Sequence, residues 1–274
     1  MTNNKVLDRP AGPRSPRILV FDIETAPVKA FVWKIWEENV GLNQIISDWH
    51  ILSWAAKWLD DKKIFYMDQR VERDVENDRK ILAGLWALLD EADIVVTQNG
   101  KAFDSKKVNA RFAIHGMGPP SPYKHIDTKI LAKRHFDFTS NSLEYLSGKL
   151  CKKNQKNKSR KFHGFELWSA CLKGDVRAWR EMEKYNKADV LATEELYKKL
   201  APWGTGIDRN VYLEKTIFSC RECGGESLQR RGFSYTGTGK FQKFHCLDCG
   251  AWSTASGDNL LSIEKRRSLK APKP

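Results

Sequence analysis

Four carboxylates in three separate motifs are the side chains best suited to chemistry. They are Asp22 and Glu24 in Ile18-Leu-Val-Phe-Asp-Ile-Glu-Thr25, Asp104 in Asn99-Gly-Lys-Ala-Phe-Asp104, and Asp189 in Tyr185-Asn-Lys-Ala-Asp189. Four carboxylates gathered at one point repel one another unless positive charge lies between them. A pair of divalent metal ions is the usual solution, and such a pair can cleave a phosphodiester.

The spacing within the motifs predicts which face of a strand or helix each acidic side chain occupies. Asp22 and Glu24 lie two residues apart on an expected strand, so they share one face while Ile23 points into the core. Tyr185 and Asp189 lie four residues apart on an expected helix and also share a face. The aspartate of the middle motif stands where a strand gives way to a helix. All three positions could converge on one cleft.

Hydrophobic periodicity predicts the elements that carry these motifs. We expect strands at 17–23, 51–59, 64–67, 93–97 and 126–128, and helices at 77–91, 104–115, 143–150 and 175–200. This order predicts an α/β fold, in which a mixed sheet is layered with helices. An insertion at 26–50 carries Trp33, Trp36 and Trp49, which could form a strand-separating wedge, although burial is the commoner use of tryptophan. Trp168 and Trp179 are expected in the core.

Taken together and in this order, the three motifs resemble those of the DEDD superfamily, which includes the proofreading 3′→5′ exonucleases and has an RNase H-like fold. The resemblance covers residues 17–203 and extends to phage-encoded exonucleases. Tyr185 lies four residues before Asp189, which is the spacing of the tyrosine subtype (DEDDy); residue 184 is lysine rather than the histidine of the other subtype. Alone, each motif would more often be an ordinary solvated strand edge or helix face.

The resemblance implies a role for each motif residue. Asp22 would bridge two Mg²⁺ or Mn²⁺ ions, Glu24 and Asp189 would complete the tighter site, and Asp104 would hold the second ion. Tyr185 would orient the attacking water; a free tyrosine titrates near pH ~10, so acting as the base would need help from the metals.

The same resemblance implies contacts with substrate. Thr25 and Ala26 would line the pocket for the terminal nucleotide, and Phe103 would pack under the site. Asn99 would contact substrate or brace its loop. Asp127 would either support the site or cap the helix that follows it.

Two Cys-x-x-Cys pairs predict a second, structural metal site. They are Cys220-Arg-Glu-Cys223-Gly-Gly and, after 22 intervening residues, Cys246-Leu-Asp-Cys249-Gly. Each pair can give two thiolates to one tetrahedral Zn²⁺, as in a zinc ribbon, and the glycines permit turns that free backbone N–H groups for the sulfurs. A redox role and ligation by His245 are weaker alternatives. Cys151 and Cys171 are expected to be ordinary thiols.

Basic residues predict a polyanionic partner. The chain has 47 Lys+Arg against 34 Asp+Glu, a formal net charge of +13 and a pI of about 9.4, which favours nucleic acid over a membrane. On the ribbon, Arg230, Arg231, Lys240 and Lys243 alternate with Phe233, Tyr235 and Phe241, a pattern that suits phosphate contact and base stacking, although about half of these aromatics would form the ribbon's own small core. The run from Lys152 to Lys161, with Lys158 and Arg160, would grip phosphates or be a solvated loop.

These features divide the chain into five parts. We expect an N-terminal arm at 1–16, a nuclease domain at 17–203, a linker at 204–215, a zinc ribbon at 216–254 and a basic tail at 255–274. No apolar run is long enough to span a bilayer, no signal core is present, and the paired cysteines suit metal rather than disulfides, so a cytoplasmic location is expected, the host cytoplasm if the origin is viral.

The sequence therefore predicts a two-metal 3′→5′ exonuclease that releases nucleoside monophosphates from DNA, with a ribbon that assists binding. A polymerase or a recombination or repair protein would be a partner. An exoribonuclease, a structure-selective endonuclease and a non-catalytic nucleic-acid-binding adaptor are the alternatives.

Overall fold

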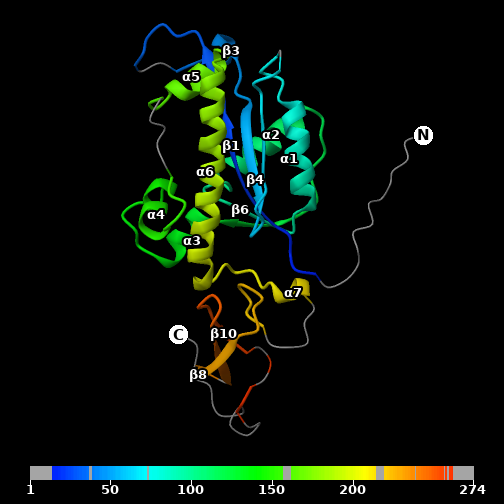
Figure 1. Cartoon of the computed structure of the whole chain (residues 1–274), viewed down its shortest axis with the longest axis vertical. Helices are drawn as coiled ribbons and strands as arrows, with labels where there is room; N and C mark the ends of the chain where they lie inside the picture. Colours follow the sequence, from blue (N-terminus) through cyan, green and yellow to red (C-terminus); the bar gives the residue numbers. More distant parts are fainter. Residues whose placement is uncertain are drawn as a thin grey trace, which may run out of the picture. The chain divides into compact units, whose positions relative to one another are not determined.

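A computed structural model describes residues 14–36, 39–72, 74–156, 162–213, 219–237, 239–255, 257 and 259–261. The chain divides into two compact units (Figure 1). The larger is Arg17–Leu200, so it ends three residues before the predicted boundary at 203. The smaller contains the residues from Ala201 onward and the segment before Arg17. Among the helices of these described ranges, none is long and apolar enough to cross a bilayer.

The larger unit is built on a five-stranded mixed sheet with strand order β5-β4-β1-β6-β7. Its strands are β1 (Ile18–Thr25), β4 (Ile51–Trp58), β5 (Ile64–Asp68), β6 (Ile94–Thr97) and β7 (Lys124–Asp127). β4 and β5 form the predicted antiparallel hairpin next to β1, whereas β6 and β7 run parallel to it. The predicted mixed sheet is confirmed, and the strand with the first two acids lies at its centre.

Helices cover both faces of this sheet. They are α1 (Arg79–Glu91), α2 (Asp104–Ile114), α3 (Thr128–His135), α4 (Leu143–Leu150), α5 (Glu166–Leu172) and α6 (Val176–Leu200). Alternate β1 residues, including Phe21 and Ile23, pack in one core with α1 and α2. On the opposite face α6 crosses β1 and β4, and α3, α4 and α5 pack against α6 (Figure 1). The period of two in β1 therefore divides the strand between a hydrophobic face and a face covered by α6.

The insertion after β1 does not bury its tryptophans as expected. It contains β2 (Lys29–Ala30), the 3-10 helix η1 (Leu42–Gln44) and β3 (Ile45–Ser47). Trp33 and Trp36 are 93% and 80% exposed, so the expectation of burial is wrong for both. The short β2–β3 ribbon has too few residues to enclose such large rings. Trp49 is half-buried, with the ammonium of Lys107 3.6 Å from a ring centroid.

The smaller unit contains a three-stranded antiparallel sheet, preceded by the 3-10 helix η2 (Ala201–Trp203) and the short helix α7 (Asn210–Leu213). The strands are β8 (Leu228–Thr236), β9 (Gly239–Cys246) and β10 (Trp252–Thr254). The segment expected to be a linker bonds to the first cysteine loop: the Thr205 hydroxyl donates to Glu222 at 2.7 Å, and the Arg209 N–H donates to the Arg221 carbonyl at 2.9 Å. Its residues 205–213 therefore belong to the cysteine unit.

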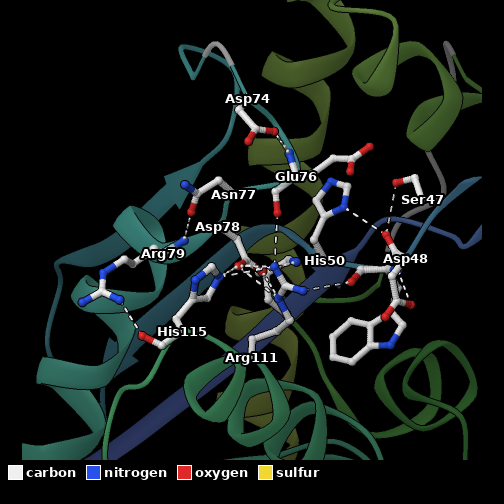
Figure 2. Close-up of polar contacts among 12 residues, drawn as sticks. Ser47, Asp48, His50, Asp74, Glu76, Asn77, Asp78, Arg79, Arg111 and His115 are labelled. Atoms are coloured by element: carbon white, nitrogen blue, oxygen red, sulfur yellow. Dashed lines mark hydrogen bonds and ion pairs between the residues drawn. The ribbon is translucent and has the colours of Figure 1, made fainter.

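A buried ion pair holds the start of α1 against α2 and β4 (Figure 2). The fully buried carboxylate of Asp78 accepts two close hydrogen bonds from the Arg111 guanidinium, at 2.8 and 2.7 Å. It also accepts the Ile51 N–H at 2.8 Å and lies 2.6 Å from His115 Nε2. Because every lone pair has a partner, the buried charge is compensated at the junction of three elements.

Replacing Arg111 with methionine should lower the free energy of unfolding by about 3–5 kcal/mol, since it leaves the Asp78 carboxylate buried without its cation. Urea denaturation measures this change. Arg79→Met is the matched control, because Arg79 is exposed and should shift the free energy by less than about 0.5 kcal/mol. Equal losses in the two variants would contradict the assignment of this pair as a clamp.

Candidate active site

The end of β1 is paired on one side only, and this leaves backbone groups beside the first two acids free of strand pairing. β6 pairs with β1 through Val20 and no further, whereas β4 stays paired as far as Thr25. The free Ile23 N–H donates instead to Asp104 Oδ1 at 3.2 Å. A backbone hydrogen bond from the first motif thus fixes the carboxylate of the second, and it explains why the second aspartate stands at the first residue of α2.

The third motif approaches from α6. Asn186 donates from Nδ2 to Asp22 Oδ2 at 2.7 Å and accepts the Ser53 hydroxyl at 3.2 Å. Asn186 is fully buried. Sequence reasoning missed this residue, although it lies three positions before Asp189 and so on the same helix face. It ties α6 to both β1 and β4 and fixes the orientation of the Asp22 carboxylate.

Three of the four predicted acids form one cluster, and Asp104 is not part of it. Carboxylate oxygens of Asp22, Glu24 and Asp189 all lie within 4.8 Å of one another. Burial, followed by the charges of Asp104, Asp189 and Glu24, raises the pKa of Asp22 well above its ordinary value. Burial and the Asp189 charge raise the pKa of Glu24 to about 8, and burial raises the pKa of Asp104 to about 7. Carboxylate oxygens this close are a donor set that divalent cations select, and a bound cation would relieve the repulsion that raises these pKa values.

An ammonium group stands where positive charge is needed. Lys156 Nζ lies 2.6 Å from Asp189 Oδ2 and 4.8 Å from the Tyr185 ring centroid. Its charge also lowers the pKa values of Asp22 and Glu24 against the effect of burial. The sequence singled out Lys158 and Arg160 from the same basic run, and both lie outside the described residues. The run itself was the available signal, but it did not distinguish Lys156 from its neighbours.

Two aromatic residues border the acids. Trp168 on α5 donates its indole N–H to Glu24 Oε2 at 3.2 Å and meets the Tyr185 ring edge-on, with centroids 5.9 Å apart. Trp168 is only partly buried, so its prediction as a plain core residue is incomplete, whereas Trp179 is in the core as expected. Burial and the Asp189 charge raise the pKa of Tyr185 to about 12.

Asp127 both caps α3 and braces the loop of the second motif. Its carboxylate accepts the N–H groups of Lys129 and Ile130 at 3.0 and 3.3 Å, which is the predicted helix cap. It also accepts those of Asn99 and Lys101 at 3.0 and 3.1 Å. Asn99 adopts a left-handed backbone conformation with φ of 68°, which asparagine tolerates better than most residues. The loop before Asp104 is therefore held at its turn.

The residues predicted to contact substrate lie in different environments. Ala26 is 2% exposed and packs in the core with Leu52 and Trp179, so its methyl group is not on a pocket surface. This corrects the prediction, because side chains of α5 and α6 cover Ala26 just after the end of β1. Thr25 is half-buried at the end of β1. Phe103 is 39% exposed, immediately before α2, so it does not pack under the site as a buried residue would.

The four cysteines of the smaller unit form one cluster. Sγ atoms of Cys220 and Cys249 lie 3.7 Å apart, as do those of Cys223 and Cys246. Zinc–sulfur bonds of about 2.3 Å in a tetrahedron place sulfurs about 3.8 Å apart, whereas a disulfide needs about 2.05 Å. The spacing therefore fits a zinc ion rather than two disulfides. Among the described residues, the metal-ligand group here contains these cysteines and not His245, whose ring packs on Trp252.

The glycines that follow the two cysteine pairs form the turns that the sequence predicted. Gly224 and Gly250, each directly after the second cysteine of a pair, have φ of 77° and 81°. Such values favour glycine. The Gly225 N–H donates to Cys223 Sγ at 3.3 Å, as expected for a metal-binding knuckle. Cys151 and Cys171 are buried thiols whose pKa values burial raises to about 11 and about 12.

Some of the aromatic side chains on β8 and β9 are exposed to solvent. Phe233 and Tyr235 are 36% and 70% exposed, Phe241 is half-buried, and the buried aromatic of β9 is Phe244. The Lys240 ammonium lies 4.0 Å from the Phe233 ring centroid. Arg230 and Arg231 are exposed on β8. Two of the three predicted stacking residues are therefore open to solvent beside cations.

A family model for the RNase H superfamily matches residues 38–201. The chain belongs to the RNase H superfamily. The match contains the second and third motifs, whereas Asp22 and Glu24 precede it. No curated protein matches the sequence. A solved structure, the family B DNA polymerase from the hyperthermophilic archaeon Pyrobaculum calidifontis, matches with a TM-score of 0.51 and 15% identity. The match covers 84% of this chain and 32% of the polymerase, so this chain spans about a third of that protein, and the likeness is one of fold.

Asp22→Asn should raise the stability of the Mg²⁺-free, zinc-loaded protein by about 1 kcal/mol, because it removes one of several mutually repelling buried charges. The folded-state pKa values are raised, so repulsion grows as pH rises through about 7 to 8; the gain should be larger at pH 8.5 than at pH 6. Urea denaturation with and without Mg²⁺ measures both effects, and Mg²⁺ should stabilise the variant less than the parent. Asp137→Asn, which removes an exposed charge, should change neither.

The purified protein should carry one zinc ion per chain, and Cys249→Ser should lose it. Chelation should unfold the smaller unit, which has little apolar core, while the larger unit keeps its helices. Elemental analysis and far-ultraviolet circular dichroism measure the two effects. Cys171→Ala should retain the zinc. Full zinc occupancy in Cys249→Ser would count against the four-cysteine site.

Proposed function

We propose that this protein is a metal-dependent 3′→5′ exonuclease of the tyrosine subtype that releases nucleoside monophosphates from DNA. The supporting observation is the convergence of Asp22, Glu24 and Asp189, from two distant motifs, with Tyr185 one helical turn before Asp189. Asp104 is tied to the same strand by the Ile23 N–H. Membership of the RNase H superfamily and the fold likeness to a DNA polymerase agree with a nuclease acting on nucleic acid.

The residues fit a pair of divalent cations. Asp22, Glu24 and Asp189 would hold one Mg²⁺ or Mn²⁺, and Asp104 with Asp22 would hold the second. The raised pKa values of the acids and the ammonium at Asp189 both indicate that the site requires positive charge. When bound, two such ions supply an activated water and neutralise charge on the departing oxygen.

The chain's own residues would orient these groups. Asn186 and the Ile23 N–H fix the Asp22 and Asp104 carboxylates, and the Trp168 indole fixes Glu24. Rigid ligands of this kind lower the cost of reaching the reactive geometry. The Tyr185 hydroxyl would orient the attacking water rather than take its proton, because a pKa of about 12 leaves it protonated at neutral pH.

The cysteine unit would assist by holding nucleic acid. Phe233 and Tyr235 offer exposed rings for stacking, and Lys240, Arg230 and Arg231 offer charges for phosphates. The net charge of +13 supports the same partner class. Lys158 and Arg160 would add phosphate contacts, and a polymerase or a recombination or repair protein would present the 3′ end.

A 5′-labelled single-stranded DNA incubated with Mg²⁺ or Mn²⁺ should give a ladder that shortens from the 3′ end. Asp189→Asn should reduce the rate at least about 10³-fold, because it removes a carboxylate that holds the cations. Asp137→Asn is the matched control and should retain the parent rate. Gel electrophoresis of a time course measures the products.

Two further substrates separate the alternatives. A matched RNA digested faster than the DNA would indicate an exoribonuclease. Cuts in a circular single strand, which has no 3′ end, would indicate an endonuclease. Binding of all three without metal-dependent cleavage would sink the enzymatic proposal and leave an adaptor, with the cysteine unit as its functional part.

A further inference from the structure

The ammonium of Lys156 is directed into the acid cluster rather than toward solvent. Nζ lies 2.6 Å from Asp189 Oδ2 and 4.8 Å from the centroid of the Tyr185 ring. The side chain is 25% exposed and that of Asp189 is 5% exposed. A lysine amine is a cation at neutral pH, and at this distance it forms an ion pair with the Asp189 carboxylate.

The backbone leading to Lys156 is held in place from α6 and α4. The Glu195 carboxylate on α6 accepts the N–H groups of Lys152 and Asn154 at 2.7 and 2.8 Å. Ser147 on α4 is fully buried, and its hydroxyl accepts the Lys156 N–H at 3.0 Å. Main-chain hydrogen bonds to Glu195 on α6 and Ser147 on α4 thus set the position of the lysine backbone. They do so independently of the acids that the lysine side chain contacts.

We propose that Lys156 is a tethered counter-cation that competes with divalent metal for Asp189 and thereby sets the metal affinity of the site. The inference rests on the proposed function, because it takes the acid cluster to be a metal site. In the metal-free protein the ammonium relieves the repulsion among the acids. The ammonium at Asp189 Oδ2 repels an incoming divalent ion and offsets the negative charge that would attract it, so metal entry weakens the lysine's ion pair.

The tether makes this competition intramolecular. When the side chain leaves Asp189, the fixed backbone keeps the ammonium within reach of the cluster, at a high effective concentration. Phosphate oxygens of a bound strand offer the displaced ammonium another charge-assisted hydrogen bond. Metal should therefore bind weakly to the free protein and more tightly once nucleic acid occupies the site, because substrate removes the competitor.

The direct test is Mn²⁺ binding to the zinc-loaded protein without nucleic acid, followed by electron paramagnetic resonance. Lys156→Met should bind Mn²⁺ on the order of tenfold more tightly, which is the factor that loss of one charge-assisted hydrogen bond represents. Lys156→Arg keeps the charge and should stay within about threefold of the parent. Lys153→Met removes an exposed charge from the same segment and should bind like the parent.

A second variant leaves the acid site and the lysine intact. Glu195→Ala removes the acceptor of the main-chain hydrogen bonds, so Mn²⁺ affinity should rise in the same direction as in Lys156→Met, by a smaller factor. In nuclease assays the Mg²⁺ concentration for half-maximal rate should fall in Lys156→Met, while KM for DNA rises. Thermal unfolding of each variant checks that it is folded.

The outcomes separate this inference from the proposed function. Parent protein that binds no Mn²⁺ at the acids would overturn both. Parent protein that binds Mn²⁺ with the same affinity as Lys156→Met would overturn the competition alone. A higher KM for DNA with unchanged Mn²⁺ affinity would make Lys156 a simple phosphate contact and would equally refute it.

Discussion

Repulsion among buried carboxylates is the constraint on which the rest of the larger unit depends. Asp22, Glu24 and Asp189 are held within 4.8 Å of one another in a site that burial makes hostile to charge. No element would adopt this arrangement for stability alone, since each acid raises the pKa of the others. The sheet, α2 and α6 are rigid enough to impose it because one hydrophobic core packs β1 against α1 and α2, and another packs α5 and the start of α6 beside the acids. Stability gained in those cores compensates for a site arranged for chemistry.

The strand pairing shows how the fold makes this possible. β1 is central, yet β6 leaves it at Val20, so its last residues have a free edge on one side. That edge supplies the N–H for Asp104, while Asn186 reaches Asp22 from α6 on the face of the sheet. If β1 were paired on both sides along its whole length, the Ile23 N–H would donate to the neighbouring strand. Asp104 would then lack the backbone hydrogen bond that fixes its carboxylate. The early end of one strand therefore joins two motifs that lie about eighty residues apart.

Periodicity and motif chemistry predicted most of this arrangement, and tertiary pairing accounts for what they missed. The strand with Asp22 and Glu24, the helix starting at Asp104 and the cysteine turns follow from local rules that the sequence displays. Asn186 and Lys156 could not be singled out in the same way, because their value comes from partners 164 and 33 residues away. Trp33 and Trp36 were misjudged for a related reason: a propensity for burial holds only where the fold supplies something to bury against, and the short β2–β3 ribbon does not.

The same physics would treat the two proposed metal sites differently. In the cysteine unit the ligands come from two tight turns, and among its described residues the core around the sulfurs is small, so metal binding and folding would be one event. In the larger unit the ligands come from elements that are already packed, so the site exists before metal arrives and must tolerate its own charge. Lys156, whose backbone is held by main-chain hydrogen bonds, offsets part of the negative charge of the acids without adding a metal ligand. A preformed acid site with a built-in cation would lose its metal without unfolding, whereas loss of metal from the cysteine unit would unfold that unit.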